Sequence, residues 1–250
     1  MNNDLITQDC LFPTDNDLEI PALRLDRQPR VADIPFLAFG EQKRTHDMLG
    51  NGTLHFYVDD YRFQTVYDHP EKILAMHPRN IVEPNFSLFN ETPVAFGLQA
   101  IYKKRQVARL MQENGLGVFV DLNVSAKFYK LNLLGVPAGY GAFCTRGYSD
   151  RIPYLEFEYR IAKMVAGDNP LLFVVYGGGA ECQRFCREVG AVYVTPVIVI
   201  KNKIKAMKKI EENVAFHQLR LGNAELQEKI DELYANQVLD YAQKPLLDKP

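Results

Sequence analysis

Four carboxylates stand where three apolar segments of the chain end. Asp59 and Asp60 follow the first segment, Glu83 ends the second, and Asp121 ends the third. Ligands of parallel α/β sheets bind at the carboxyl ends of the strands, where converging carboxylates suit acid–base catalysis or a divalent metal such as Mg²⁺. The four are therefore candidate catalytic residues, with Asp59 and Asp121 as candidate metal ligands. The alternative is that they only shape turns.

Polar side chains beside these carboxylates extend the candidate ligand-binding site. Adjacent aspartates cannot point the same way along a strand, so one can face a ligand while the other holds Arg62 or caps the next turn. Asn85 and Ser87 alternate along one face after the second segment, and Asn123 follows the third segment. A capped loop that leads to the next helix would explain Asn85 and Ser87 without a ligand.

A run of three glycines, Gly177, Gly178 and Gly179, joins an apolar strand to a predicted helix. Glycine lets backbone N–H groups approach an anion, a helix N-terminus adds a favourable dipole, and barrels often bind phosphate after late strands. Arg146 follows another strand and would add positive charge to the same rim, unless it makes a surface salt bridge. The run has neither the G-x-G-x-x-G spacing nor a Walker lysine, so it indicates no particular nucleotide-binding fold. A tight strand-to-helix turn is the alternative.

Cysteine and histidine do not add a second constellation. Cys182 and Cys186 lie four residues apart and could join Cys144 in a soft-metal site, but no C-x-x-C pair and no obvious fourth ligand accompany them. We therefore expect packed thiols. The five histidines are scattered without a convincing nucleophile beside them, so a Ser-His-Asp or Cys-His enzyme is not supported.

Short apolar segments rich in Val, Phe and Tyr alternate with helical stretches along the chain. Their continuous apolar character predicts strands buried on both faces, and the alternation predicts parallel pairing with right-handed crossovers. We expect an α/β fold with a (β/α) barrel-like, irregular parallel sheet; an open doubly wound sheet is the alternative. An eighth strand could come from Ile198–Ile200 or from the N-terminal segment. The predicted strands are 34–39, 54–58, 80–83, 117–121, 140–145, 171–176 and 192–199.

Composition divides the chain into three parts. Residues 1–33 are polar and contain prolines, and they predict a strap, with a short strand near 18–25, on a domain that spans 34–200. Residues 201–250 predict a charged helical tail, whose five lysines between Lys201 and Lys209 could contact nucleic acid. Apolar residues at a and d spacing from Met207 onward could pack on the barrel or form a coiled-coil contact in a homo-oligomer.

Overall composition limits the classes of function. The 250 residues carry a net charge of −2, with 24% charged and 47% hydrophobic residues, which is typical of a globular protein and argues against tight bulk binding of nucleic acid. The N-terminal residues lack the apolar region of a signal peptide, and no apolar run approaches the ~20 residues that span a bilayer. Four cysteines without a disulfide spacing indicate a reducing compartment. We expect a cytoplasmic protein with no membrane contact.

Part of the sequence resembles an uncharacterised family of bacterial, archaeal and phage proteins. The resemblance covers about Ile34–Val199 and is carried by the H-F-Y-V-D-D-Y-R-F block at His55–Phe63 and by His69–Lys72 and Glu83–Leu88. This chain departs from the family pattern at two places. It has Glu83 and Asn85 where the pattern has small or acidic residues, and Asp-Leu-Asn at 121–123 where the pattern has a more aromatic strand end. The resemblance implies an intracellular protein often carried by phages or other mobile elements. It transfers no activity and no catalytic residue.

Two functions of different classes fit these observations. The first is an enzyme that acts on a phosphate-containing ligand, a nucleotide or a nucleic-acid end: the glycine run holds phosphate, and the carboxylates bind a metal or transfer protons. The second is a non-enzymatic, phage-encoded binding or assembly protein that uses the helical tail. The fold cannot choose between them, because barrels host many functions.

Overall fold

The computed structural model describes residues 12–41 and 48–221, with no side chain described at 201, 203 or 212–221. The chain forms two compact units, Met1–Val197 and Ile198–Pro250. All of the candidate site residues lie in the first unit, whereas the lysine run lies in the second.

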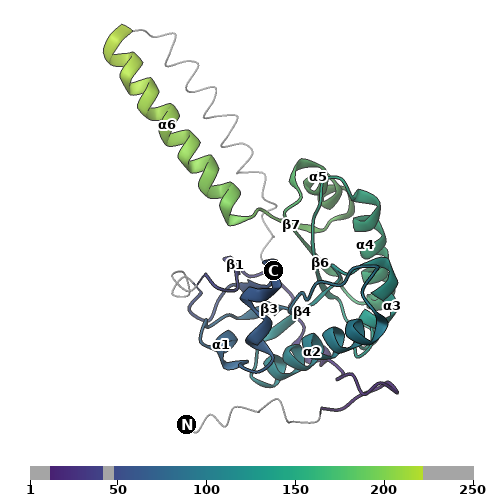
Figure 1. Cartoon of the computed structure of the whole chain (residues 1–250). Coiled ribbons are helices and arrows are strands. Elements are labelled where there is room, and N and C mark those ends of the chain that lie inside the picture. The colour runs from purple at the N-terminus through teal and green to yellow at the C-terminus, as the bar shows by residue number, and fades with distance from the viewer. Residues whose placement is uncertain (1–11, 42–47, 222–250) are drawn as a thin grey trace. The chain divides into compact units, whose positions relative to one another are not determined.

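A parallel sheet of seven strands forms the core of the first unit (Figure 1). Each strand pairs with its neighbours along the chain, in the order β1 to β7. This order follows from strand–helix alternation, since each right-handed crossover can place the next strand beside the last. The α/β class is confirmed, and each of the seven strands overlaps one predicted segment, with β2 beginning one residue early and β5 ending one residue late. They are β1 (Phe36–Ala38), β2 (Thr53–His55), β3 (Asn80–Val82), β4 (Gly117–Asp121), β5 (Ala142–Arg146), β6 (Leu172–Tyr176) and β7 (Val192–Val194).

Two strand predictions at the margins of the sheet are wrong. The last strand ends at Val194, and Ile198–Ile200 lies in helix α6 (Val197–Leu221), because a β-branched run is only a weak signal when a long helical pattern continues it. Residues 18–25 form no strand of the sheet; an isolated antiparallel bridge joins Thr14 to Pro21 instead. The part of the chain that the structure describes therefore has no eighth strand in the sheet.

The sheet is curled into a half-barrel. Tyr176 on β6 lies against His55 on β2, with ring centroids 4.1 Å apart, and against Phe36 on β1 at 6.1 Å. Four strand spacings separate β2 from β6, which would be about 19 Å in a flat sheet. The curl and the unbroken strand order confirm the barrel-like prediction over the doubly wound alternative, whose order reverses at a switch point.

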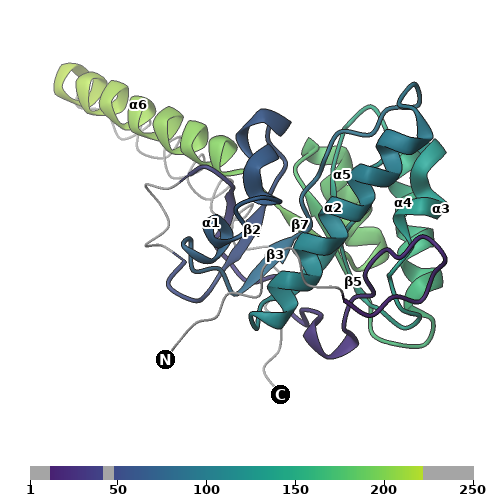
Figure 2. The same ribbon diagram turned by 60° about the horizontal axis from the view of Figure 1, so that its bottom comes forward.

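Helices cover the outside of the curl. Helix α2 (Val94–Glu113) packs on β4, α4 (Ile152–Ala166) on β5, and α5 (Gly179–Val189) on β7. Figure 2 shows α2 in front of the sheet. The remaining short elements are α1 (Glu71–Leu74), α3 (Tyr129–Asn132) and the 3-10 helices Leu25–Arg27, Asp60–Arg62, Gln64–Val66 and Ala126–Phe128.

The segment 12–33, which we call the strap, is hydrogen-bonded to the half-barrel. The N–H of Arg24 donates to Oε1 of Gln112 on α2 at 2.7 Å. Oε1 of Gln28 accepts from the N–H of Gly141, just before β5, at 2.6 Å. In Figure 2 the strap, coloured purple, runs beside α2. The strap is therefore held by residues of the half-barrel that lie far from it in the sequence.

Helix α6 is the described part of the second unit, and it begins before the predicted boundary at Lys201. Ile204 and Ile210 are 47% and 37% exposed, and the side chains of Lys205, Lys208 and Lys209 are also exposed. The side chains of Lys201 and Lys203, and the predicted heptad positions after Ile210, lie outside the described residues. No helix in the described ranges is long and apolar enough to cross a membrane.

Candidate functional site

Two carboxylates and two cations form what we call the buried cluster, where β3 and β4 end. It consists of Glu83, Asp121, and Lys104 and Arg105 of α2, whose side chains are at most 2% exposed. Arg105 Nη1 donates to Glu83 Oε1 at 2.6 Å. Lys104 Nζ lies 3.7 Å from Glu83 Oε2 and 3.6 Å from Asp121 Oδ2. Each carboxylate therefore faces a cation.

Backbone groups add hydrogen bonds to the buried cluster, although Nε of Arg105 has no partner among the described residues. Arg105 Nη2 donates to the carbonyl of Asn132 at 2.7 Å, and Lys104 Nζ donates to the carbonyl of Asp121 at 3.2 Å. The N–H of Asp121 donates to Glu83 Oε2 at 3.1 Å. Because buried charges are tolerated when they are paired and hydrogen-bonded, the cluster has the properties of a structural site.

Asp121 also contacts residues of the segments that follow β2, β3 and β4. Tyr57 donates its hydroxyl to Asp121 Oδ1 at 3.0 Å, and the N–H of Asn123 donates to the same atom at 3.2 Å. With its amide nitrogen turned toward its acceptors, Asn85 donates to Asp121 Oδ2 at 3.1 Å. Burial raises the pKa of Asp121, and the neighbouring Lys104 opposes this rise. The structure thus brings Asp121, Asn85 and Asn123 together.

The first pair of predicted carboxylates lies outside the buried cluster. Asp60 accepts hydrogen bonds from the N–H and the hydroxyl of Ser87, both at 2.9 Å, so its partner is Ser87 rather than Arg62. Asp59 and Arg62 are exposed, and neither has an ion pair with another described residue. Among the described residues no group of three His, Cys, Asp or Glu side chains is arranged to hold a metal. Metal binding by Asp59 stays a prediction.

The glycine run forms a packed strand-to-helix turn. Gly177, Gly178 and Gly179 have φ values of 76°, 90° and 74°, a region that other residues enter at a cost. The N–H of Gly177 donates to the carbonyl of Val194 at 3.0 Å. A Cβ on Gly178 would lie 2.4 Å from Cys182 Sγ. The turn itself therefore requires glycine, and an anion contact there stays a prediction.

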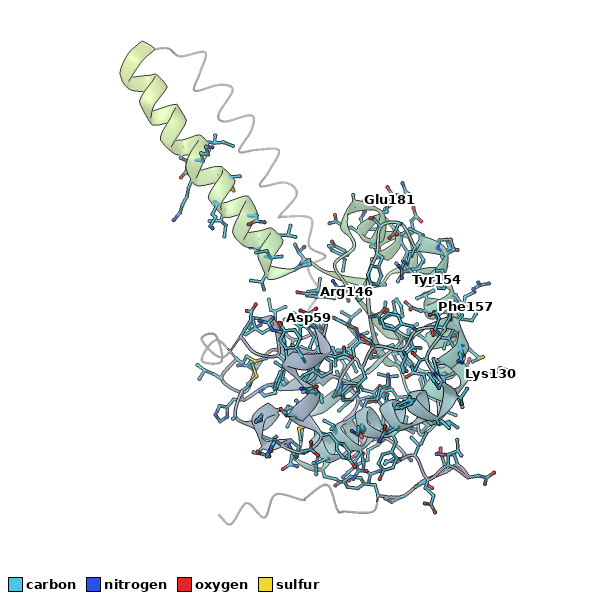
Figure 3. The ribbon with its side chains drawn as sticks, in the orientation of Figure 1. Asp59, Lys130, Arg146, Tyr154, Phe157 and Glu181 are labelled. Atoms are coloured by element: carbon cyan, nitrogen blue, oxygen red, sulfur yellow. The ribbon has the colours of Figure 1, made fainter. Side chains whose placement is uncertain are left out.

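Two exposed arginines lie close to one tyrosine at the carboxyl end of β5, and we call Arg146, Tyr148 and Arg151 the arginine stack. The guanidinium carbons of Arg146 and Arg151 lie 5.4 and 5.1 Å from the centroid of the Tyr148 ring. Asp150, 76% exposed, lies 3.9 Å from Arg151, and no other described residue forms an ion pair with either arginine. Figure 3 shows Arg146 at the edge of the domain. The stack thus retains positive charge for a partner.

Aromatic side chains fill the inside of the half-barrel behind Arg146. Arg146 is in register with Tyr176 on β6, whose ring packs on His55. His55 is 1% exposed, and its Nδ1 accepts from the N–H of Tyr57 at 3.2 Å, which places the proton on Nε2. Burial, with a contribution from Arg146, lowers the pKa of His55 to about 3. The interior is therefore aromatic and His55 is neutral.

The three described cysteines, Cys144, Cys182 and Cys186, are free and buried, as expected for packed thiols. Burial raises the pKa values of the thiols at Cys144, Cys182 and Cys186, the last to about 12. Since the thiolate is the reactive form, these groups are poor nucleophiles in this fold.

Comparison with known proteins gives a family for the chain. A family model described as "Domain of unknown function (DUF4417)" matches residues 12–189. The chain belongs to this family. The DUF4417 match runs from the strap to the end of α5, so α6 lies outside it.

Two relatives of the DUF4417 domain come from bacteriophages. The "Gene 1 protein" of Mycobacterium phage L5 is 27% identical over 186 residues, which cover 72% of this chain and 80% of the phage protein. The "Gene 1 protein" of Mycobacterium phage D29 is 27% identical over 189 residues, which cover 72% and 67%. No solved structure gives a significant match to the chain. These findings confirm the family resemblance and support a phage context.

Sequence reasoning missed residues of the DUF4417 domain in three places. Lys104 and Arg105 gave no signal, because a pair of cations in a helix resembles an ordinary solvated face. A third buried carboxyl, Glu158 of α4, is 6% exposed and was hidden among exposed helix residues. Tyr148 and Arg151 could have been found, since the stretch Arg-Gly-Tyr-Ser-Asp-Arg after a predicted strand interleaves an aromatic residue with cations.

Proposed function

We propose that the DUF4417 domain of this chain binds a phosphate-containing ligand, a nucleotide or a nucleic-acid end, at the arginine stack. The observation that carries this proposal is the pair of exposed guanidinium groups held on one tyrosine ring at the carboxyl end of β5. Ligands of (β/α) folds bind at this end of the strands. Guanidinium forks match the oxygens of phosphate in a bidentate geometry.

Tyr148 gives the stack its preorganisation. Cation–π contact holds both guanidinium groups close to the ring, so that less side-chain freedom is lost when a ligand binds. Because the N–H of Gly177 is already bonded to Val194, we assign the main phosphate contacts to Arg146 and Arg151 and a lesser part to the glycine turn.

If the bound ligand is also a substrate, we assign its reaction to exposed acidic residues at the carboxyl ends of the strands. Glu83 and Asp121 are buried and paired with Arg105 and Lys104, so they do not supply a free base. Asp59 is exposed after β2, and metal-assisted hydrolysis through Asp59 stays a prediction. The phage relatives are compatible with a nucleotide or nucleic-acid ligand.

Binding is tested with the full chain and a fluorescently labelled single-stranded oligonucleotide that carries a 5′ phosphate. Fluorescence anisotropy should show Kd rising about 100-fold in the Arg146→Ala/Arg151→Ala variant, since each of the two lost charged contacts is worth roughly a factor of ten. Raising the salt concentration should weaken binding, with a slope reduced by about 1 for each lost phosphate contact.

The matched control is Arg187→Ala, which removes an exposed arginine near the other end of α5. This variant should bind as the unmodified chain does. Equal affinity of the double variant and the control would rule out the arginine stack as the binding site. Labelled ATP used in the same assay distinguishes a nucleotide from a nucleic-acid end.

A second candidate function is a non-enzymatic binding or assembly protein that uses α6. The exposed Ile204 and Ile210 on this lysine-bearing helix favour it. Ile204→Glu/Ile210→Glu in the full chain should then shift sedimentation toward the monomer, because a charge in an apolar seam is costly. Lys209→Glu, an exposed position about 140° around the helix from Ile204 and about 100° from Ile210, is the control. Unchanged sedimentation of the double variant would count against this second candidate.

A further inference from the structure

A second charged feature lies at the opposite end of the strands. A cleft of about 260 Å³ is lined by strap residues and by the first residues of β3 and β4, Asn80 and Gly117. Three of its lining residues are arginines, Arg27, Arg30 and Arg79. We call it the arginine cleft. It faces away from the carboxyl ends of the strands and so is separate from the arginine stack.

The arginines of the cleft are weakly paired. Arg79 lies 3.6 Å from Asp33 and its side chain is 62% exposed. Arg27 lies 3.9 Å from Asp26 and is 42% exposed. No carboxylate in the described ranges lies within ion-pair distance of Arg30. Exposed pairs at such distances are weak, so most of the positive charge is still available.

The two acidic residues of the cleft are already engaged by other groups. Arg24, which is not a lining residue, binds Asp26 Oδ2 at 2.7 Å with Nη2 and Oδ1 at 3.0 Å with Nε. Asp33 Oδ2 accepts a hydrogen bond from Asn80 Nδ2 at 2.7 Å. Asp26 is therefore paired mainly with Arg24, and Asp33 lies near Arg79. Neither carboxylate neutralises Arg30.

Close packing shapes the wall between the strap and the strands. A Cβ on Gly117 would lie 2.3 Å from Asn80 Oδ1 and 3.0 Å from Pro29 Cγ. The absence of a side chain at Gly117 therefore lets the strap approach the starts of β3 and β4. Arg30 follows Pro29 directly, and both Arg30 and Arg79 line the cleft.

We propose that the arginine cleft is a binding site for a small oxyanion ligand, a phosphate or a carboxylate, which joins the strap to the start of β3. Like charges on one cleft repel, and a bidentate oxyanion between guanidinium groups removes that repulsion. The volume lies below the roughly 300–1,000 Å³ of pockets that enclose drug-sized ligands. The ligand is therefore smaller than a nucleotide, which distinguishes this site from the one at the arginine stack.

The test is isothermal titration of the full chain with inorganic pyrophosphate and, separately, with citrate. Saturable binding of either probe is expected, and Arg30→Ala/Arg79→Ala should weaken it about 10-fold or more. Pyrophosphate alone identifies phosphate as the natural chemistry, and citrate alone identifies carboxylate. Hydrogen exchange of residues 26–33 should slow when the probe binds, because the strap is then held at both ends.

Controls separate this site from the arginine stack. Arg187→Ala should keep the affinity of the unmodified chain for the probe that binds, and Arg146→Ala/Arg151→Ala should remove only binding at the arginine stack and leave the binding that Arg30→Ala/Arg79→Ala weakens. Absence of saturable binding of both probes at about 10 mM would overturn the proposal. It would also be overturned if Arg30→Ala/Arg79→Ala bound as tightly as Arg187→Ala, or if only the variant of the arginine stack lost the probe.

Discussion

The buried cluster and the arginine stack occupy equivalent places in the half-barrel but differ in charge pairing. Both lie at the carboxyl ends of strands and both contain arginine. Arg105 in the buried cluster is fully buried, with Glu83 at 2.6 Å. Arg151 in the stack is 60% exposed, and its acidic neighbour Asp150 is 3.9 Å away. The charges of the buried cluster are paired with one another, whereas the arginines of the arginine stack are only weakly paired.

This difference shows that residue type and strand-end position do not by themselves indicate a binding site. What decides is whether another element supplies the opposite charge. Helix α2 places Lys104 and Arg105 against the ends of β3 and β4, so the carboxylates there are paired with cations. No described residue forms an ion pair with Arg146, so its charge is available to a partner.

The largest effect is expected from Glu83→Gln in the buried cluster. This change leaves the buried Arg105 and Lys104 short of one negative charge, and breaking a buried pair costs roughly 3–5 kcal/mol of unfolding free energy. Urea denaturation followed by circular dichroism measures the loss. Glu181→Gln, which removes an exposed partner of Arg184, is the control. A loss below about 1 kcal/mol would contradict the structural role of the buried cluster.

Glu158 extends the comparison to a buried carboxyl that has no cation partner among the described residues. Burial raises its pKa well above the ordinary value of 4.5, the Thr145 hydroxyl lowers it, Asp121 raises it and Tyr129 lowers it. The folded chain therefore keeps a proton that the unfolded chain has lost. Stability is fully present below pH 4.5 and falls as the pH rises toward the folded pKa.

Glu158→Gln should remove this loss. Relative to the unmodified chain, the variant should gain about 1.4 kcal/mol of unfolding free energy for each pH unit above the ordinary pKa until the folded pKa is reached. Urea denaturation at pH 5 and pH 7 measures this gain. Glu156→Gln, exposed on the same helix, should show no such trend. An equal pH trend in both variants would mean that Glu158 is ionised in the folded chain.

A smaller loss of stability is expected from Asp60→Ala, because Asp60 is less buried than the buried cluster and better bonded than the arginine stack. Asp60 is partly exposed and accepts two hydrogen bonds from Ser87, so its removal should cost about 1 kcal/mol. Thermal unfolding measures the change. Asp59→Ala is the matched control at the adjacent exposed position, and its effect should lie within about 0.5 kcal/mol of zero. Equal losses in the two variants would remove the distinction between Asp59 and Asp60.

The smallest effect on stability is expected from the arginine stack. Arg146→Ala/Arg151→Ala should change the unfolding free energy by less than about 0.5 kcal/mol, because exposed cations with weak pairing contribute little. Denaturation of this variant beside the binding assay separates the two roles. A loss of more than about 2 kcal/mol would place the stack with the buried cluster as a structural feature.

Most of the strand pattern could be predicted from the sequence because buried parallel strands give continuous apolar runs. The segment 171–176 is such a run, and it became β6 almost without change. Long-range pairing could not be predicted. The side chains of Lys104 and Arg105 look like a solvated face until α2 is packed on β4, and only the curl of the sheet brings Tyr176 to His55.

The candidate site was predicted in part. Glu83, Asn85, Asp121 and Asn123 do lie together, because the ends of adjacent parallel strands must meet. Their charges could not be assigned to catalysis or to stability, since the cations come from a helix at a distant part of the sequence. The run 192–199 was misjudged for the opposite reason: local propensity favoured a strand up to Val199, and the helical pattern of the following segment prevailed.

The strand order has a consequence for how the chain acquires its fold. Each strand pairs only with its predecessor and its successor, from β1 to β7, and the described residues contain no strand that closes the sheet back onto β1. No early strand has to wait for a late one, so the sheet can grow during translation, at roughly 5–20 residues per second. The strap must wait until Gln112 and then Gly141 have been synthesised. The strap is made before these partners, so it can take its final position on the half-barrel only after they have been made.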